Sequence, residues 1–418
     1  MFEMNPWWES GSVPSTFLPP SKRTLFSELE RSLDQRYMDI LVGLRRTGKT
    51  TLMFQLIDHL LRRGTDPREI LYFTFDEHWR EIRDIIQEYE TRVLRGKLRE
   101  RRVYLFFDEI HKLPDWPDKL KILYDLNPKA KMIVSGSASL NLMRGARESL
   151  AGRCIFHRLD PLSFKEFLLL RGEKVPPPED FEIFESRLAI SFQEFLTRGF
   201  PEVVGAGDRE AERYTKELVL ERILYRDIPQ CFPVDDVELL RLLFEHISLN
   251  PGTILNVDSL SKSLGRARRT IGNYLNFLEL TFLIRRLSNV RGSMLASSRK
   301  NKKGYPYHPC LCLTREESKK VETLVISELD AGFYWRAGNL EVDLVLKDGP
   351  VLPVEVKYKE RIEERDLKGM RAFMDRFGAK RGIVVAKREM ARRGKIEIFP
   401  VLWFSLYKEG LIQGTGTP

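Results

Sequence analysis

The feature that most constrains this chain is a short loop, residues 43–50, with the sequence GLRRTGKT. A mostly apolar run, residues 38–42, precedes the loop, and apolar residues at three- to four-residue spacing follow it. Glycines at both ends of such a loop let successive N–H groups, with the positive end of the following helix, face a polyphosphate. The strand–loop–helix context predicts a phosphate-binding loop that binds a nucleoside triphosphate.

Side chains of the loop have separate predicted roles. Lys49 would reach the β- and γ-phosphates as a point charge, and the Thr50 hydroxyl would hold Mg²⁺. Arg45 and Arg46 either add positive charge near the nucleotide or a neighbouring subunit, or lie solvated on the loop surface. We therefore expect ATP and Mg²⁺ as ligands. The predicted nucleotide-binding residues are Gly43, Leu44, Arg45, Arg46, Thr47, Gly48, Lys49, Thr50 and Thr51.

A second apolar strand, residues 103–107, ends in Asp108 and Glu109. Behind a phosphate-binding loop this is the Walker B arrangement, in which Asp108 holds Mg²⁺ through water and Glu109 polarises the attacking water. A further predicted strand, residues 70–75, lies between the two motifs and indicates the additional-strand class of P-loop ATPases. A fourth strand leads into Ser-Gly-Ser within residues 132–137, where a polar side chain either senses the γ-phosphate or forms a strand-end turn.

Composition limits the remaining classes. A chain of 418 residues is too long for one core, so two to four domains are expected. No apolar run approaches the roughly 18 residues of a membrane span, and the first residues lack the pattern of a signal peptide. Four irregularly spaced cysteines do not suggest a disulfide framework. We therefore expect a cytoplasmic protein without a membrane partner.

Positive charge is concentrated in one segment. Residues 261–303 hold eleven Lys and Arg against one acidic residue, a local balance of +10, whereas the whole chain carries +9. The rest of the chain is therefore close to neutral. Such a concentration is typical of a nucleic-acid-binding surface. The alternative is a solvated basic face.

The same segment contains a helix-turn-helix pattern. Asp258 would cap a short helix, residues 259–264, and Gly265 would make the turn into a longer helix, residues 266–280. In a helix-turn-helix the second helix enters the major groove of DNA, and residues 283–287 would form the wing strand of a winged helix. The alternative is a plain helical hairpin. The predicted DNA contacts are Arg266, Arg268 and Arg269.

In the C-terminal part, a helix over residues 319–329 carries Glu322, a strand over residues 340–345 carries Asp343, and the next strand carries Glu355 and Lys357 on one face. This arrangement resembles the PD-(D/E)XK nuclease core. The resemblance implies that Asp343 and Glu355 bind Mg²⁺, that Lys357 positions the attacking water, and that Glu322 is a further carboxylate. The alternatives are a hairpin with a charged outer face, or a related fold that binds DNA without cleaving it.

Several motifs together resemble an archaeal and bacterial AAA+-type ATPase family, whose members usually carry a C-terminal domain of uncharacterised function. The motifs are NPWW (residues 5–8), DEIHKLPDW (108–116), IVSGSAS (133–139), SLAGR (149–153), PLSFKEFL (161–168), RGFPEVV (198–204) and ILYRDI (223–228). The resemblance implies a helical lid over the nucleotide and, by analogy, assembly with further copies of the chain. It also implies a role for Arg153 as an arginine finger or nucleotide sensor, with a salt bridge as the alternative.

The predicted architecture is an α/β P-loop NTPase of the AAA+ type with a helical lid, a winged helix and an α/β nuclease-like domain. The predicted segments are an N-terminal arm (1–22), the ATPase core (23–170), the lid (171–232), the winged helix (233–290), a basic linker (291–313), the nuclease-like domain (314–410) and a tail (411–418). We expect the nucleotide state to control a DNA-engaging arm. The alternatives are an ATP-gated, Mg²⁺-dependent DNA nuclease and an ATPase switch whose winged helix binds a protein partner.

Overall fold

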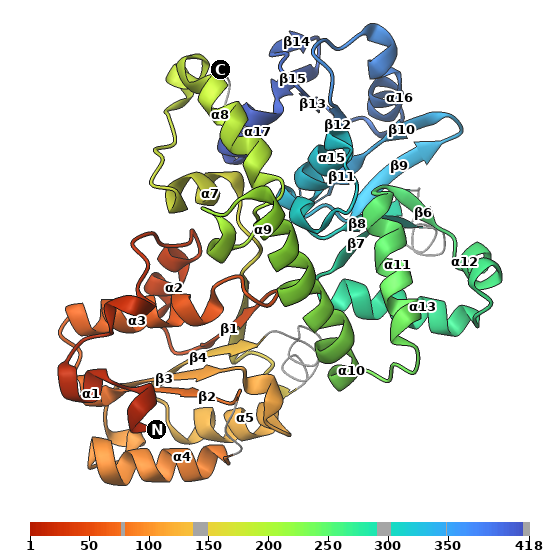
Figure 1. The fold of residues 1–418 in the computed structure, drawn as a ribbon. Coiled ribbons are helices and arrows are strands. Elements are labelled where there is room, and N and C mark those ends of the chain that lie inside the picture. Colours follow the sequence, from red (N-terminus) through yellow and green to blue (C-terminus); the bar gives the residue numbers. More distant parts are fainter. Residues whose placement is uncertain (77–79, 137–148, 291–301, 348, 413–418) are drawn as a thin grey trace. The chain divides into compact units, whose positions relative to one another are not determined.

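The computed structural model describes residues 1–76, 80–136, 149–290, 302–347 and 349–412 (Figure 1). The chain divides into two compact units, Met1–Pro161 and Leu162–Pro418. Across these described ranges, none of the helices has the length and apolar character needed to cross a membrane.

The N-terminal unit is built on a five-stranded parallel sheet with the order β2-β3-β4-β1-β5. Its strands are β1 (Met38–Val42), β2 (Ile70–Thr74), β3 (Val103–Asp108), β4 (Ala130–Gly136) and β5 (Cys154–Arg158). Strands β1, β3 and β4 are buried along their whole length, as expected of a parallel sheet that is covered on both faces. In the sheet, β4 lies between β1, which leads into the loop of residues 43–50, and β3, which ends in Asp108. The predicted additional-strand arrangement, in which another strand separates the strands of the two motifs, is therefore confirmed.

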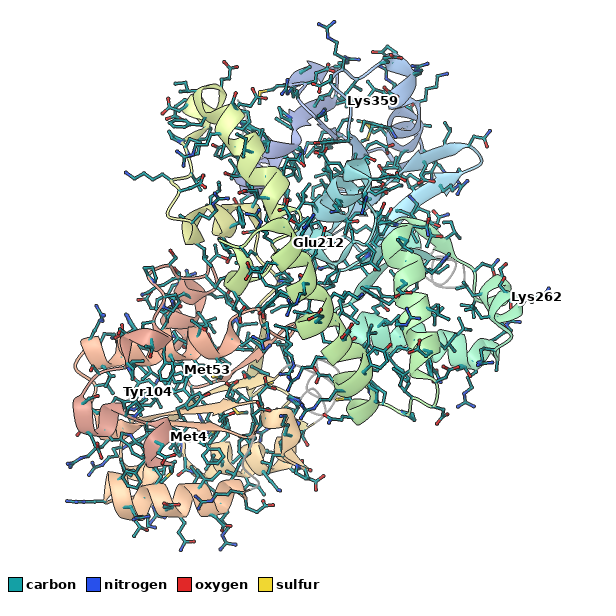
Figure 2. The ribbon with its side chains drawn as sticks, in the orientation of Figure 1. Met4, Met53, Tyr104, Glu212, Lys262 and Lys359 are labelled. Atoms are coloured by element: carbon teal, nitrogen blue, oxygen red, sulfur yellow. The ribbon has the colours of Figure 1, made fainter. Side chains whose placement is uncertain are left out.

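Helices cover both faces of this sheet (Figure 1). One face carries α2 (Phe26–Ser32) and α3 (Lys49–Arg62), and the other carries α4 (Ile82–Tyr89) and α5 (Trp116–Leu126). Met53 of α3 and Tyr104 of β3 belong to the same apolar cluster, and both are labelled in Figure 2. The loop of residues 43–50 therefore connects a central strand to a helix that is fixed by its buried face.

The predicted N-terminal arm is packed onto the edge strand β2. Asn5, just before α1 (Trp7–Ser10), donates from Nδ2 to the Tyr72 carbonyl at 2.9 Å and accepts from the Tyr72 amide at 2.7 Å. The indoles of Trp7 and Trp8 both donate to the Ile70 carbonyl, at 3.2 and 2.8 Å. The arm thus satisfies polar backbone groups that an edge strand would otherwise expose.

A buried polar network joins three strands of the same sheet. Asp39 of β1 and Lys131 of β4 are both fully buried, and the Lys131 ammonium lies 2.7 Å from Asp39 Oδ2. His157 Nε2 of β5 lies 2.8 Å from Asp39 Oδ1, and the Ser32 hydroxyl donates to Asp39 Oδ2 at 2.5 Å. The Lys131 ammonium also donates to the Tyr37 carbonyl at 2.7 Å. Each buried charge therefore has an opposite charge and further hydrogen-bond partners.

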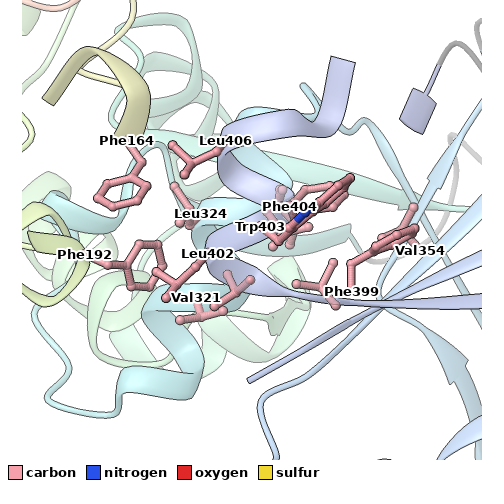
Figure 3. Close-up of a cluster of buried hydrophobic side chains, with 14 of the residues drawn as sticks. Phe164, Phe192, Val321, Leu324, Val354, Phe399, Leu402, Trp403, Phe404 and Leu406 are labelled. Carbon is pink, nitrogen blue, oxygen red and sulfur yellow. The ribbon is translucent and has the colours of Figure 1, made fainter. Parts of the chain in front are cut away.

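The C-terminal unit begins with one helix that was predicted as the end of the ATPase core, α7 (Phe164–Leu170), and with the helices that were predicted as a separate lid. The latter are α8 (Phe181–Phe195), α9 (Asp208–Arg213), two π-helical segments (Tyr214–Leu220 and Ile223–Asp227) and α10 (Ile228–Cys231). Phe164 and Phe192 pack in one apolar cluster with Leu402 and Leu406 of α17 (Val401–Ile412), as Figure 3 shows. The prediction of a separate lid over residues 171–232 is therefore corrected, because these helices belong to the C-terminal unit. There, α17 buries nearly every side chain of its first half in the shared apolar cluster.

Three helices and three strands follow in the order α11-β6-α12-α13-β7-β8. Their bounds are α11 (Val237–Leu249), β6 (Thr253–Leu255), α12 (Val257–Leu264), α13 (Arg268–Leu280), β7 (Ile284–Asn289) and β8 (Lys302–Pro306). Strand β8 pairs antiparallel with both β6 and β7. The cap of α12 is Asn256, whose side chain accepts from the amides of Asp258 and Ser259, so the prediction that Asp258 is the cap was wrong.

The predicted basic linker is wrong where the structure describes it. Lys302 and Lys303 lie in β8, and Pro309–Leu311 forms a buried 3-10 turn. Residues 291–301 of that linker lie outside the described residues. A run of polar and basic residues predicts a linker from composition alone, but β8 is held in place by a strand on each side.

Two more sheets complete the unit, with the orders β10-β9-β7-β8-β6 and β11-β12-β13-β15-β14. The remaining elements are α15 (Glu317–Glu328), β9 (Phe333–Ala337), β10 (Leu340–Val342), β11 (Leu344–Leu346), β12 (Leu352–Lys357), α16 (Lys368–Phe377), β13 (Gly382–Ala386), β14 (Ala391–Arg393) and β15 (Ile396–Pro400). The strand predicted over residues 340–345 is interrupted at Asp343, because β10 pairs with β9 and β11 pairs with β12 in different sheets. Strand β9 also pairs in parallel with β7. The segment from α11 to β8, called the basic helical segment below, and the C-terminal module, which begins at α15, therefore share one sheet.

Candidate functional site

The loop of residues 43–50 has the close approach and the backbone angles that its glycines allow. A Cβ atom on Gly43 would lie 2.2 Å from the Leu159 carbonyl oxygen, so no larger residue fits there without a shift of the backbone. Gly48, at the start of α3, has φ 94°, and Arg46 has φ 64°. Both residues are in the left-handed region, which glycine adopts without steric cost and arginine adopts only with strain.

Lys49 is buried against its own loop. Its ammonium donates to the carbonyls of Gly43 and Leu44, at 3.1 and 2.8 Å, and the residue is only 5% exposed. Of the two loop arginines, Arg45 is half-buried and Arg46 is exposed. The lysine is thus the cation at the centre of the loop, as its predicted contact with phosphate requires.

Arg23 braces the loop from the N-terminal segment, and the sequence analysis missed it. Its guanidinium donates to the Thr47 carbonyl at 2.6 Å and to the Asp160 carbonyl at 2.8 Å, while the Thr47 hydroxyl donates to the Leu44 carbonyl at 2.9 Å. No motif surrounds Arg23, so no sequence signal identified it.

Asp108, at the end of β3, is the meeting point of the predicted Mg²⁺ site. The Thr50 hydroxyl donates to Asp108 Oδ2 at 2.6 Å, and the Tyr72 hydroxyl donates to the same oxygen at 3.0 Å. Ser135, at the end of β4, contacts the other oxygen. Burial, then the Asp108 charge, raises the pKa of Tyr72, which keeps the phenol a donor. The Thr50 hydroxyl and the Asp108 carboxylate are hard oxygen ligands, so these residues fit Mg²⁺.

Glu109 occupies a strained position beside this carboxylate. Its φ is 53°, and its amide donates to Asp108 Oδ1 at 3.1 Å and to the Ser135 hydroxyl at 3.3 Å. His111 Nδ1 lies 3.3 Å from Glu109 Oε2. A left-handed non-glycine residue costs of order 1–3 kcal/mol and is often found at functional sites. Of the two serines at the end of this predicted strand, Ser135 contacts the Asp108 carboxylate and the Glu109 amide, and Ser137 lies outside the described residues.

Arg153 forms the salt bridge that the sequence left open as an alternative. Its guanidinium donates to both oxygens of Asp125, at 2.9 and 3.2 Å. The hydrogen bond between them raises the pKa of Arg153 and lowers that of Asp125. Within one copy of the chain, Arg153 is therefore engaged away from the phosphate-binding loop.

The predicted DNA contacts lie together at the start of α13. Arg266, Arg268 and Arg269 are all exposed. Arg266 lies 2.9 Å from Asp236, and Arg268 lies 2.5 Å from Asp258, so two of the three arginines share their charge with an acid. The buried face predicted for this helix is observed. Its buried residues are Ile271, Tyr274, Leu275 and Leu278. Lys262 of α12 is exposed as well and lies at the outer edge of this segment (Figure 2).

The four residues of the predicted nuclease-like site also come together. Asp343 accepts at Oδ2 from the Val356 amide at 2.9 Å, and its own amide donates to Glu355 Oε2 at 3.2 Å. The Lys357 ammonium lies 2.5 Å from Glu355 Oε1. Burial, then the Asp343 charge, raises the pKa of Glu355 to about 8. The same two causes raise the pKa of Glu322.

Donors outside the predicted set complete this cluster. The Tyr305 hydroxyl donates to Glu322 at 2.7 Å, and the Lys303 ammonium contacts Glu341 and lies 3.7 Å from Asp343 Oδ1. Nowhere in the described part of the chain do three or more His, Cys, Asp or Glu side chains gather in a way that could hold a metal ion. At the predicted Mg²⁺ pair of Asp343 and Glu355, ammonium groups already hold the place of a cation: Lys303 faces Asp343 Oδ1 and Lys357 faces Glu355 Oε1.

Comparison with known families divides the chain into three parts. Residues 35–168 match an AAA domain family, residues 191–315 match a domain of unknown function, and residues 319–404 match a second domain of unknown function. The second match includes the basic helical segment, and the third match covers most of the C-terminal module. Neither match gives these parts an activity.

Similar curated proteins are themselves uncharacterised. One from Methanocaldococcus jannaschii is 24% identical over 82% of this chain and 79% of its own length. One from Haemophilus influenzae is 26% identical over 63% of this chain and 65% of its own length. A second protein from Methanocaldococcus jannaschii is 30% identical over 65% of this chain and 60% of its own length. The chain thus spans less than two thirds of two of these three relatives.

Two solved structures have distant similarity. The ORC2 protein of Aeropyrum pernix in its ADP form gives a TM-score of 0.35 at 13% identity, over 70% of this chain and 92% of that one. PCH-2 of C. elegans gives a TM-score of 0.27 at 14% identity, over 47% of this chain and 60% of that one. Together, the family match and the parallel sheet with its phosphate-binding loop support an AAA-type P-loop domain over residues 35–168.

Proposed function

We propose that the N-terminal unit binds ATP and hydrolyses it to ADP and phosphate. The observation that carries this proposal is the 2.6 Å hydrogen bond between Thr50 and Asp108, which joins the phosphate-binding loop to the end of β3. Mg²⁺ held there would neutralise charge on the β- and γ-phosphate oxygens. Two motifs that are 58 residues apart in sequence thus supply one ligand set.

The side chains around this pair have separate roles. The Lys49 ammonium, which donates to two loop carbonyls, would transfer its hydrogen bonds to the β- and γ-phosphates. Glu109 would accept a hydrogen bond from the attacking water and orient it in line with the γ-phosphate. The strained backbone of Glu109 and the hydrogen bonds that its amide donates to Asp108 and Ser135 hold the Glu109 carboxylate beside Asp108.

Two substitutions test these roles separately. Lys49→Ala is expected to abolish binding of a fluorescent ATP analogue, whereas Glu109→Gln is expected to keep binding and stop phosphate release. Lys129→Ala is a matched control, because Lys129 is an exposed lysine of the same unit that donates to the Glu100 carbonyl. Hydrolysis at the wild-type rate in both Lys49→Ala and Glu109→Gln would refute the assignment.

We also propose that the segment from α11 to β8 is a winged helix that binds DNA. The order α11-β6-α12-α13-β7-β8, with β8 antiparallel to β6 and β7, supports the fold. The exposed arginines at the start of α13 and the local balance of +10 support the partner. The nucleotide state of the N-terminal unit would then govern how this segment engages DNA.

Salt dependence distinguishes DNA from a protein partner. Replacing Arg268 and Arg269 by alanine is expected to lower affinity for duplex DNA and to reduce the slope of log affinity against log salt by about two. Replacing Arg209 and Arg213, which are exposed on α9, is the charge-matched control. No measurable affinity for duplex DNA at low salt would favour the alternative of a protein partner.

The C-terminal module is proposed to have a nuclease-like fold. The order of α15, the strands β11 and β12, α16 and β13 supports it, as do the positions of Asp343 and Glu355.

ATP turnover with and without duplex, single-stranded and branched DNA would test the coupling of the units. Equal turnover under all four conditions would refute control of a DNA-engaging arm by nucleotide.

A further inference from the structure

In the C-terminal unit, a lysine from the basic helical segment lies inside the carboxylate cluster of the neighbouring module. Lys303 belongs to β8, which pairs with β6 and β7, whereas the carboxylates come from α15 and from the strands around β10 to β12. The Lys303 side chain is only 6% exposed. Its ammonium contacts Glu341 and lies 3.7 Å from Asp343 Oδ1.

Protein groups face the oxygens at which a metal ion would bind. Asp343 Oδ1 faces the Lys303 ammonium, and Asp343 Oδ2 accepts from the Val356 amide. Glu355 Oε1 faces Lys357, and Glu355 Oε2 accepts from the Asp343 amide. All four oxygens of the predicted metal pair are therefore engaged, and the group facing Asp343 Oδ1 is itself a cation.

The third carboxylate of the predicted set is engaged in the same way. Glu322 Oε1 accepts from the Tyr305 hydroxyl at 2.7 Å, and Glu322 Oε2 lies 3.2 Å from the Lys319 ammonium. Tyr305 follows Lys303 by two residues on β8, so the two side chains leave the strand on the same face. One strand thus delivers both a cation and a hydroxyl donor into the cluster.

Counted with every group in its charged form, the cluster is electrically balanced without a metal. Its acidic members are Glu322, Glu341, Asp343 and Glu355, and the cations that pair with them are Lys303, Lys319, Arg336 and Lys357. A divalent ion added to this set would leave an excess of positive charge at a largely buried place, unless an ammonium left. Lys303 is the ammonium that a metal bound to Asp343 Oδ1 would have to replace.

We propose that Lys303 is a built-in cation that takes the place of a divalent metal ion in the C-terminal module. The module then holds its carboxylates together without a metal and does not cleave nucleic acid. The inference rests on the nuclease-like fold proposed above and is independent of ATP hydrolysis in the N-terminal unit. It also gives β8 a second role, because the strand joins the basic helices to the module through charge as well as through backbone pairing.

Metal binding by the full-length, nucleotide-free protein tests the proposal. Mn²⁺ is titrated and the free ion is followed by electron paramagnetic resonance, because the N-terminal site offers few protein ligands until nucleotide supplies phosphate oxygens. Lys303→Met is expected to bind one Mn²⁺ at least about tenfold more tightly than the wild type. Adding Asp343→Asn to Lys303→Met is expected to remove that site. Lys302→Met is the matched control, because Lys302 is the preceding residue of β8 and points to the opposite face.

Two results would overturn the proposal. One is a Lys303→Met protein that keeps its circular dichroism spectrum and binds Mn²⁺ no better than the wild type. The other is tight Mn²⁺ binding by the wild type that Asp343→Asn abolishes.

If Lys303→Met does not fold, plasmid cleavage by the wild-type protein decides. Intact plasmid after incubation with Mg²⁺ or Mn²⁺ supports the proposal, and nicking that Asp343→Asn abolishes overturns it.

Discussion

The buried ion pair of Asp39 and Lys131 makes a quantitative prediction about the N-terminal sheet. Removing one partner of a buried pair costs about 3–5 kcal/mol, because the other charge stays buried without compensation. After Lys131→Met, Asp39 keeps hydrogen bonds to His157 and Ser32, so the cost should lie near 3 kcal/mol. After Asp39→Leu, the buried Lys131 ammonium loses its carboxylate partner and keeps neutral contacts with Tyr37, a hydrogen bond to the carbonyl and a place over the ring, so the cost should lie near 5 kcal/mol.

The double variant separates coupling from simple loss of packing. With Asp39→Leu and Lys131→Met together, no unpaired charge of this pair remains, so the double variant should be more stable than either single variant. Hydrogen-exchange mass spectrometry of peptides that cover β1 and β4 measures the opening free energy in each case. Circular dichroism checks that each variant is folded. Costs of the two single changes that simply add would show that the pair is not coupled and would refute the reasoning.

Three further predictions concern single side chains. Tyr72→Phe removes one hydrogen bond from Asp108, the predicted Mg²⁺ ligand, and should raise the Mg²⁺ concentration needed for half-maximal ATP hydrolysis several-fold. Nucleotide affinity measured without Mg²⁺ should change little, and an unchanged Mg²⁺ requirement would contradict a positioning role for Tyr72. Burial raises the pKa of Glu328, and Lys408 lies 3.5 Å away, so protonation favours folding there and the penalty grows as pH rises above the unfolded value. Glu328→Gln should therefore gain thermal stability relative to the wild type as the pH rises above 4.5, the ordinary pKa of the carboxyl group, and a difference that does not change with pH would contradict this. Gly43→Ala would place a methyl group 2.2 Å from the Leu159 carbonyl and should abolish binding of a fluorescent ATP analogue, so retained affinity would show that the loop can relax.

Local patterns were sufficient to identify most of the side chains that meet at the proposed nucleotide site. The loop of residues 43–50 and the strand ending in Asp108 are continuous in sequence, and each carries its chemistry within a few residues. Their neighbourhood in space follows from the parallel sheet, because parallel strands bring their carboxyl ends to one edge. Arg23 could not be found in this way, because its partners are main-chain carbonyls 24 and 137 residues away.

Composition was misleading in the C-terminal unit. Lys303 sits in a polar, basic run that resembles a linker, and the acid it contacts, Glu341, lies 38 residues further along the chain. Of the helices predicted as a separate lid, α8 packs on α17, about two hundred residues away in sequence. In both cases the deciding contact joins distant segments, and no local spacing reports it. The carboxylates were found because strand alternation and an Asp followed by Glu-x-Lys are themselves local patterns.

The segment around Asn5 also limits how copies of this chain can assemble. Because Asn5, Trp7 and Trp8 occupy polar backbone groups on the free side of β2, a strand from a second copy cannot add there without first displacing them. An oligomer that keeps these residues in place therefore cannot be built by running this sheet from one subunit into the next through the β2 edge.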